Sequence, residues 1–201
     1  RYAWDMYFDY LENSGLGILA KIAARYFLHK LRVWDVAASA RVDYFIANSN
    51  YVARRIAKTY RRPAFVAHPP IKHSDYSIGN TKDYYLSLGQ LVSYKRIDML
   101  VEAFSRMPNR KLVVVGSGPM MRKLQRNSAP NVQFTGWVDT ETARNYYRGC
   151  RAFLFPGLED YGIAPLEAQA SGRPVIAYGK GGVLETVKGV YCEQSKIGRA
   201  H

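Results

Sequence analysis

Two glutamates flank a glycine and a proline in the stretch EDYGIAPLE. Glu159 and Glu167 are separated by seven residues, and Gly162 and Pro165 lie between them. The apolar run just before this stretch predicts a buried strand over 152–157, which places Glu159 near the strand's carboxyl end, where parallel sheets bind ligands. Gly162 lets the backbone approach a ligand closely, and Pro165 suits the first turn of a following helix. The pattern therefore predicts a ligand site with two carboxylates.

Glu167 also has a purely structural interpretation. We expect it in the first turn of a helix over 165–172, where a carboxylate interacts favourably with the helix dipole by about 0.3–1 kcal/mol. That interpretation leaves Glu159 and Gly162 unexplained.

Backbone amides at the same predicted edge favour an anionic ligand. The amides of Ile163 and Ala164 are expected to point out of a helix N-terminus, where anions bind. Gly181 and Gly182, in GKGGVLE (179–185), free the backbone to cradle a phosphate group after the next strand.

A lysine and an arginine follow the first strand of this region. They are Lys95 and Arg96, at the end of GQLVSYKR (89–96), and a lysine there can serve a pyrophosphate as a point charge. Together with the two glycine-containing turns, they predict a diphosphate ligand. The similar stretch GSGP (116–119) is explained by a tight strand-to-helix turn alone.

These residues are positioned by a regular alternation of strands and helices. The strands are apolar without alternation, which predicts an α/β fold with a parallel sheet covered by helices on both faces. The expected strands are 84–89, 111–116, 131–136, 152–157, 174–179 and 190–192, and the expected helices are 96–107, 119–128, 140–150, 165–172 and 184–189.

A separate region precedes this alternation. It ends at Pro69 and Pro70, which suit neither helix nor strand interiors, and a polar stretch follows. We therefore expect one domain over 1–72 and a second over 73–195. In the first, the sequence predicts a helix over 17–40, a buried strand over 43–49, a helix over 50–60 and a strand over 64–70.

The composition is that of a basic globular protein. Hydrophobic residues make up 48% of the 201 residues, and 29 Lys and Arg against 16 Asp and Glu give a net charge of +13. This balance suits anionic partners, but the charge is spread along the chain and no nucleic-acid-binding motif is visible, so we expect no nucleic-acid partner. Cys150 and Cys192 lack metal-site spacing and are expected to be free thiols of a cytosolic protein.

Basic residues gather on one face of the first predicted helix. Lys21, Arg25, His29 and Arg32 fall close together beside an apolar stripe. A solvated face is the simpler interpretation, and peripheral contact with anionic lipid at the inner face of the cell membrane is the alternative.

Several motifs resemble one enzyme family. EDYGIAPLE, followed by ASGRPVIAYGKGGVLE, is similar to the paired-glutamate region of retaining GT-B glycosyltransferases of family four. LVSYKRIDMLVEAF and the earlier RVDYFIANS, VARRI and HPP resemble the same family, with mannosyltransferases of bacterial and archaeal surface polysaccharides as the nearest likeness. The resemblance implies two Rossmann-like domains, of which residues 1–72 would be the last part of the first.

The resemblance also implies roles for the site residues. Glu167 would hold the ribose hydroxyls of a nucleotide sugar, Glu159 the donor sugar and the charge at its anomeric carbon, and Lys95 the diphosphate. The base would lie near Gly136 and Trp137, and Arg96 would compensate for the neutral Gln90 at the diphosphate. Contacts to sugar and phosphates are implied for the amides of Gly162, Ile163, Ala164, Gly181, Gly182, Val183 and Leu184. No metal or cofactor is implied, and the sequence has no Asp-x-Asp pair to hold a metal.

The implied reaction is transfer of mannose from GDP-mannose, with retention, to a glycan or lipid-linked acceptor. A UDP-sugar donor and an inactive nucleotide-binding relative remain alternatives. The chain departs from the family at Gln90, where an arginine is usual, and it lacks most of the N-terminal domain. We therefore expect these residues alone to be inactive, and we expect 196–201 to be a non-native tail.

Overall fold

The computed structural model describes residues 3–7, 11 and 15–189, which form two compact units. The first unit consists of the described residues up to Ala47 with Val52–Ala67, and the second of Asn48–Tyr51 with the described residues from His68 onward. The domain boundary expected after residue 72 stays a prediction. The tail expected at 196–201 lies outside the described residues.

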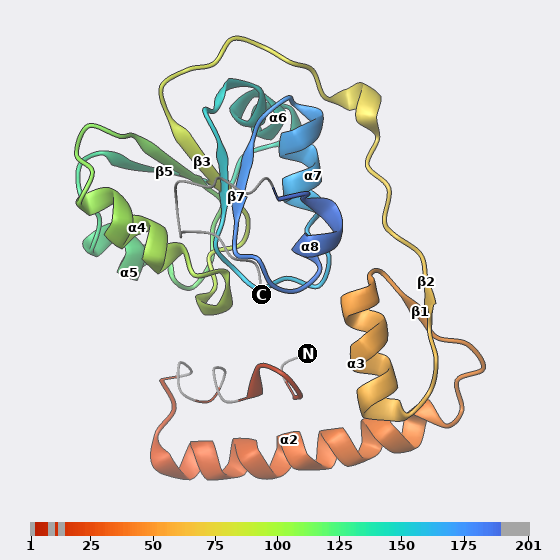
Figure 1. Ribbon diagram of the computed structural model, residues 1–201. Coiled ribbons are helices and arrows are strands. Elements are labelled where there is room, and N and C mark those ends of the chain that lie inside the picture. The colour runs from red at the N-terminus through yellow and green to blue at the C-terminus, as the bar shows by residue number, and fades with distance from the viewer. Residues whose placement is uncertain (1–2, 8–10, 12–14, 190–201) are drawn as a thin grey trace. The chain divides into compact units, whose positions relative to one another are not determined.

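A long helix, α2 (Ile18–Ser39), dominates the first unit (Figure 1). It confirms the helix expected over 17–40. Its apolar stripe lies at the surface, where Leu19 is 84% and Phe27 is 68% exposed. The basic residues Arg25 and His29 are exposed as well. No helix among the described residues is long and apolar enough to cross a lipid bilayer.

The two strands of the first unit are short. β1 (Ile46–Ala47) pairs in parallel with β2 (Phe65–Val66), and α3 (Asn50–Tyr60) connects them. The strand expected over 43–49 is confirmed at Ile46–Ala47 only, and it is buried in part, since Ala47 is 1% but Ile46 is 72% exposed. Within the described residues these strands form a sheet of two, which is too narrow to have both faces covered.

Asp35 of α2 accepts two side-chain hydrogen bonds within the first unit. Its carboxylate accepts hydrogen bonds from the indole of Trp4 at 2.9 Å and from the hydroxyl of Tyr60 at 2.7 Å. Burial and the hydrogen bond to Asp35 raise the pKa of Tyr60 to about 12, so this hydroxyl remains a donor at neutral pH. Asp35 thereby links α2 to the end of α3.

A five-stranded parallel sheet forms the centre of the second unit, as predicted. The chain enters at the middle strand, builds outward on one side, and then returns to the other side of the first strand. In spatial order the strands are β5 (Val132–Gly136), β4 (Leu112–Val115), β3 (Tyr85–Leu88), β6 (Phe153–Phe155) and β7 (Val175–Ala177). The strand expected over 190–192 lies outside the described residues.

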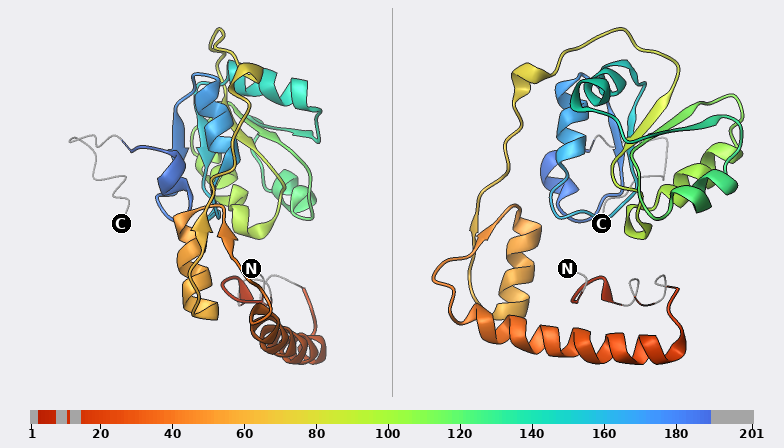
Figure 2. Two further views of the ribbon diagram at one scale, coloured as in Figure 1. Left: turned by 90° about the vertical axis from the view of Figure 1, so that its right-hand side faces the viewer. Right: turned by 180° about the vertical axis from the view of Figure 1, so that it is seen from behind.

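Helices cover both faces of this sheet, and both layers are visible in Figures 1 and 2. One face carries α4 (Ile97–Ser105) and α5 (Met121–Arg126); the other carries α6 (Thr140–Gly149), α7 (Ile163–Ala170) and α8 (Val183–Thr186). Short 3-10 turns, η1 (His73–Asp75) and η2 (Ser93–Lys95), precede β3 and α4. The predicted helices of this unit are confirmed: α4 and α5 are shorter than expected at both ends, whereas α7 and α8 begin and end earlier than expected.

The core lies on both sides of the sheet, and β4 shows why its strands are uniformly apolar. Leu112 and Val114 pack in the cluster beneath α4 and α5, while Val113 and Val115 pack in the cluster beneath α6 and α7. Successive side chains of a strand point to opposite faces, and here both faces are buried. Each fully buried side chain of this kind contributes about 1.5–3 kcal/mol.

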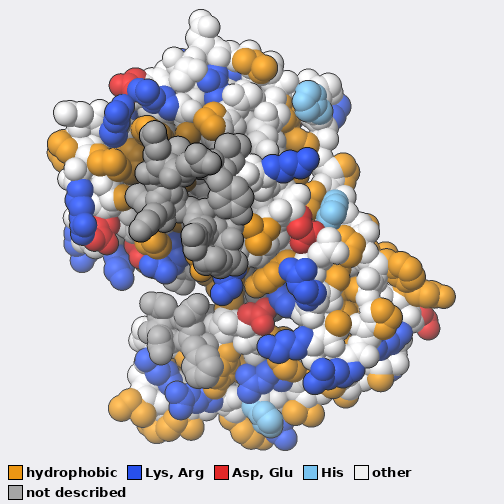
Figure 3. Space-filling view, viewed as in Figure 1, with side chains coloured by type: hydrophobic (Ala, Val, Ile, Leu, Met, Phe, Trp, Pro, Cys, Tyr) orange, Lys and Arg blue, Asp and Glu red, His pale blue; other side chains and the backbone are white. Residues whose placement is uncertain are grey.

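Basic side chains are spread over the surface of both units. Figure 3 shows Lys and Arg side chains in many separate places on the visible face. The structure therefore agrees with the dispersed positive charge of the sequence.

Candidate functional site

The sheet reverses its direction of growth between β3 and β6, which are neighbours although two strands separate them along the chain. Ligands of open α/β sheets bind at such a reversal, outside the carboxyl ends of the strands. Lys95 follows β3 and Glu159 follows β6, and Lys95 Nζ lies 2.6 Å from Glu159 Oε1. Their side chains are 21% and 17% exposed. The structure thus brings together the two residues expected to be catalytic.

Close backbone packing holds Lys95 in place. A Cβ added at Gly157 would lie 2.9 Å from Lys95 Cα, so the loops after β3 and β6 touch backbone to backbone. Lys95 Nζ also lies 5.6 Å from the ring centroid of Phe155, the last residue of β6. Arg96, in contrast, turns outward and pairs with Asp98 at 3.5 Å. Lys95 is therefore fixed at the sheet reversal, while Arg96 lies at the surface.

Helix α7 begins earlier than the sequence predicted. Gly162, with φ of 98°, precedes the first helical residue Ile163, and Pro165 is the third. Glu167 is consequently the fifth residue, so its expected place in the first turn is wrong. The left-handed backbone of Gly162 sets the start, and a proline within the first turn is tolerated because its missing amide has no partner there. The dipole interpretation of Glu167 loses its basis, since that effect is confined to the first turn.

Two tyrosine hydroxyls contact Glu167 instead. Tyr76 donates to Oε1 at 2.7 Å, and Tyr147 of α6 donates to Oε2 at 2.9 Å. Sequence analysis missed both tyrosines, and only the helical periodicity of α6 offered a signal for Tyr147.

The glycines after β7 pack directly against the loop that carries Glu159. The amide of Gly182 donates to the carbonyl of Glu159 at 2.9 Å, and a Cβ on Gly182 would lie 2.0 Å from the Asp160 carbonyl oxygen. The Gly182 amide is therefore engaged within the protein. The predicted phosphate contacts of Gly181, Val183 and Leu184 stay predictions.

A pocket of about 320 Å³ lies at the carboxyl ends of β3, β4 and β5. It adjoins Lys95, because a Cβ added at Gly89, one of its lining residues, would lie 3.8 Å from Lys95 Nζ. Trp137, which is 77% exposed, forms part of its wall, and Gly136 ends β5 directly before it. The region expected to receive the base is thus a real hollow. Its lining residues are Leu88, Gly89, Gln90, Val115, Gly116, Ser117, Trp137 and Val138.

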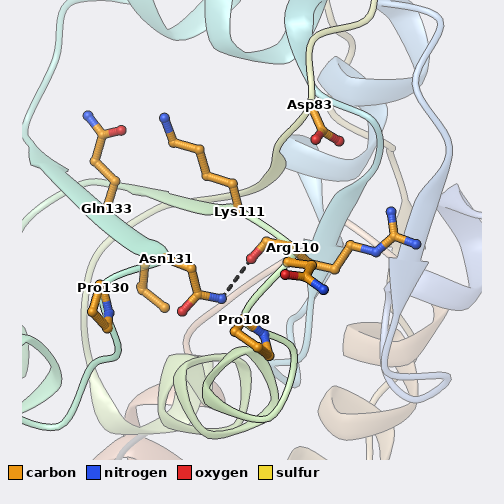
Figure 4. A pocket seen from close by; sticks show the side chains of 9 residues that line it. Asp83, Pro108, Arg110, Lys111, Pro130, Asn131 and Gln133 are labelled. Carbon is orange, nitrogen blue, oxygen red and sulfur yellow. Dashed lines mark hydrogen bonds between the residues drawn. The ribbon is translucent and has the colours of Figure 1, made fainter.

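A larger hollow of about 590 Å³ lies at the opposite, amino edge of the sheet (Figure 4). The side-chain amide of Asn131 lines it and donates to the carbonyls of Phe104, Met107 and Arg110. Asn131 thereby fixes the chain between α4 and β4. None of the residues expected in the donor site lines this hollow.

Glu185 is another residue of the second unit to which sequence analysis gave no role. It accepts hydrogen bonds from the amides of Asn50 at 2.8 Å and Tyr51 at 3.0 Å, and it lies 3.2 Å from His68 Nε2. Burial opposes ionisation, but these hydrogen bonds outweigh it and lower the pKa of Glu185. The ring of His68 in turn stacks on Tyr161 at 5.3 Å.

More than half of the chain matches the model of one protein family. The family model of glycosyl transferases, group 1, matches residues 70–192. O-antigen chain mannosyltransferase C of Escherichia coli is 30% identical over 159 residues, which are 69% of this chain and 42% of that protein. A GDP-mannose-dependent monoacylated alpha-(1-6)-phosphatidylinositol monomannoside mannosyltransferase of Corynebacterium glutamicum is 34% identical over 183 residues, 73% of this chain and 47% of that protein. The chain spans less than half of either relative.

Solved structures share the fold. Sucrose-phosphate synthase from Thermosynechococcus elongatus gives a TM-score of 0.70 at 22% identity, over 80% of this chain and 46% of that chain. HepE of Anabaena in complex with UDP and glucose gives 0.69 at 18% identity, over 79% of this chain and 50% of that chain. The predicted α/β fold of the GT-B type is confirmed.

The contact of Gly182 with the Glu159 loop gives a stability prediction. Gly182→Ala should lower the free energy of unfolding by about 1–3 kcal/mol, because the new Cβ overlaps the Asp160 carbonyl oxygen. Gly189→Ala is the matched control, since its Cβ would meet nothing within 4 Å. Urea unfolding of both variants measures the difference, and equal stabilities would contradict the close approach.

Proposed function

The chain belongs to the group 1 glycosyl transferases, and from this premise we propose that it supplies the donor-binding part of a retaining mannosyltransferase. The donor is GDP-mannose, and the acceptor is a glycan or a lipid-linked sugar. The names of the relatives support this donor, since one is a mannosyltransferase and another is GDP-mannose-dependent.

The observation that carries the proposal is the Lys95–Glu159 ion pair at the reversal of the sheet. Its 2.6 Å contact keeps a cation and an anion next to each other at the carboxyl ends of β3 and β6. A nucleotide sugar needs both, because its leaving diphosphate becomes more negative while its anomeric carbon becomes more positive. The base pocket adjoins the same edge, so a single extended donor can reach both places.

Lys95 stabilises the leaving diphosphate in this proposal. An ammonium group has three N–H donors, so Lys95 can contact phosphate oxygens while it keeps its contact with Glu159. The amides of Ile163 and Ala164, at the N-terminus of α7, add donors that are already oriented. These groups supply the positive charge that the leaving group needs, so transfer is proposed to require no metal ion.

Glu159 acts on the sugar half of the donor. Its carboxylate accepts hydrogen bonds from sugar hydroxyls and supports the positive charge that develops at the anomeric carbon. That interaction strengthens as the glycosidic bond to phosphate lengthens, and so it lowers the barrier more than it tightens ground-state binding.

The nucleotide half lies along the ends of β3, β4 and β5. Glu167 holds the ribose hydroxyls, and the base enters the pocket beside Trp137, whose exposed ring offers a face for stacking. A UDP-sugar is the second candidate donor, because HepE, a neighbour in fold, was solved with UDP and glucose.

The acceptor side includes the surface of α2. Its exposed Arg25 and His29 lie beside exposed Leu19 and Phe27, a combination that suits peripheral contact with anionic lipid. Such contact would place the enzyme at the inner, cytoplasmic face of the membrane, where a lipid-linked acceptor is available.

Calorimetric titration of the 201-residue chain with GDP, UDP and ADP tests the donor assignment. GDP should bind most tightly, and EDTA should not change its affinity, because Lys95 and backbone amides bind the diphosphate. Tighter binding of UDP would move the assignment to a UDP-sugar. Absence of binding by all three would contradict the donor site.

Glu159→Ala separates sugar contacts from nucleotide contacts. The variant should bind free GDP within about twofold of the parent, but GDP-mannose roughly tenfold more weakly, because hydrogen bonds to the ionised carboxylate are lost. Matched titrations with both ligands check this. Equal loss for GDP and GDP-mannose, or sugar transfer by these 201 residues alone, would contradict the proposal.

Gln90→Arg tests the departure from the family pattern. Gln90 is exposed and lines the base pocket at the end of β3. An arginine there should tighten GDP binding at low ionic strength and lose the gain as salt screens the added charge. Gln90→Lys serves as a control for charge without the planar guanidinium. No gain with either variant at any salt concentration would show that the diphosphate does not pass near this position.

A further inference from the structure

The carboxylate of Glu167 is held at both of its oxygens. Tyr76 donates to Oε1 at 2.7 Å and Tyr147 donates to Oε2 at 2.9 Å. A helical side chain leans toward the N-terminus of its helix, and α6 and α7 both begin at the carboxyl edge of the sheet. The side chain of Glu167, the fifth residue of α7, therefore leans toward the edge that carries Lys95, and Tyr147 contacts it from the eighth position of α6.

Within the part of the chain that the structure describes, these two hydrogen bonds leave half of the carboxylate's capacity for a ligand. An ionised carboxylate only accepts, and its two oxygens offer about four lone-pair positions. The tyrosine hydroxyls occupy two of them, one on each oxygen. The remaining positions are also one on each oxygen, which suits two adjacent donors such as the vicinal 2′ and 3′ hydroxyls of a ribose.

Both tyrosines are themselves well fixed. Tyr147 is 1% exposed and packs on Phe153 with ring centroids 5.4 Å apart. Tyr76 is half-buried, with the guanidinium of Arg144 5.5 Å from its ring centroid, and Arg144 is held by Asp75 at 2.5 Å. The two hydroxyls are thus anchored from different elements, α6 and the segment before β3.

The hydroxyls also remain donors at neutral pH. Burial, followed by the hydrogen bond to Glu167, raises the pKa of Tyr76 to about 12. Burial and the charge of Glu167 raise the pKa of Tyr147 well above its ordinary value. Both hydroxyls therefore act as donors to the oxygens of Glu167.

We propose that Tyr76 and Tyr147 are positioning residues, which hold the Glu167 carboxylate in the orientation that receives the vicinal hydroxyls of the donor's ribose. This inference rests on the proposed function of Glu167. Its new content is that ribose recognition depends on Tyr76, a residue outside the helices and strands of the donor domain, in the segment that leads into β3. A carboxylate fixed in advance loses less freedom on binding and so binds its ligand more tightly.

A simpler possibility is that Tyr76 only ties its segment to α7. The two possibilities predict different effects when the hydroxyl is removed. A tether affects stability and every ligand alike, whereas a positioning residue affects only ligands that carry the ribose hydroxyls.

Tyr76→Phe removes the hydroxyl and keeps the ring beneath Arg144. The full 201-residue chain is titrated calorimetrically with GDP and with 2′,3′-dideoxy-GDP. The parent should prefer GDP by about tenfold to a hundredfold, from hydrogen bonds to a charged group. Tyr76→Phe should reduce that preference by roughly two- to tenfold through weaker GDP binding, with unchanged affinity for the dideoxy compound.

Tyr146→Phe is the control. It also removes one tyrosine hydroxyl, at the position directly before Tyr147 in α6. Among the described residues, Tyr76 and Tyr147 are the tyrosines whose hydroxyls bond to Glu167. The control should keep the full preference for GDP. A preference in Tyr76→Phe equal to that of the parent, whatever its melting temperature, would overturn the inference.

Glu167→Ala distinguishes failure of this inference from failure of the proposed function. If Glu167→Ala abolishes the preference for GDP while Tyr76→Phe retains it, Glu167 binds ribose without help from Tyr76, and only the inference falls. If the parent shows no preference for GDP, or binds neither compound, the ribose assignment and the inference fall together.

Discussion

Direct backbone contact between the loops at the carboxyl edge of the sheet is the constraint on which the site depends. Gly157 lies against Lys95, Gly182 against Asp160 and Gly116 against the carbonyl of Gly89, at separations that leave no room for a Cβ. Any side chain at these positions would force the loops apart. Because the loops meet in this way, Lys95 and Glu159 lie 2.6 Å apart although they come from different strands. Two groups of opposite charge are thus kept at the point where the sheet reverses.

The second carboxylate is held by a different kind of interaction. Glu159 is positioned by a cation and a loop, whereas Glu167 sits within a helix and is oriented by the neutral hydroxyls of Tyr76 and Tyr147. This difference is consistent with the roles proposed for Glu159 and Glu167. An acid next to Lys95 can respond to charge that develops on the sugar and diphosphate. An acid held by neutral donors suits ribose hydroxyls, which take no part in the reaction.

Features that follow from a rule of chain geometry could be predicted from the sequence. Features that depend on contacts between distant residues could not. Lys95 and Glu159 could be expected to meet, because each follows a parallel strand and parallel strands end at one edge. The start of α7 was expected at Pro165, but the left-handed backbone of Gly162 places it at Ile163. Tyr76 could not be found, because it lies in a polar stretch without periodicity, 91 positions from Glu167. The burial of β1 was overestimated, because an apolar sequence does not show how many neighbouring strands and helices will cover it.

A crystal structure of this chain with GDP tests the central claim most directly. The account predicts diphosphate density within hydrogen-bond distance of Lys95 Nζ and of the amides of Ile163 and Ala164, with the base beside Trp137. Density for the diphosphate in the hollow at the amino edge, where Asn131 binds the carbonyl of Arg110, would contradict it.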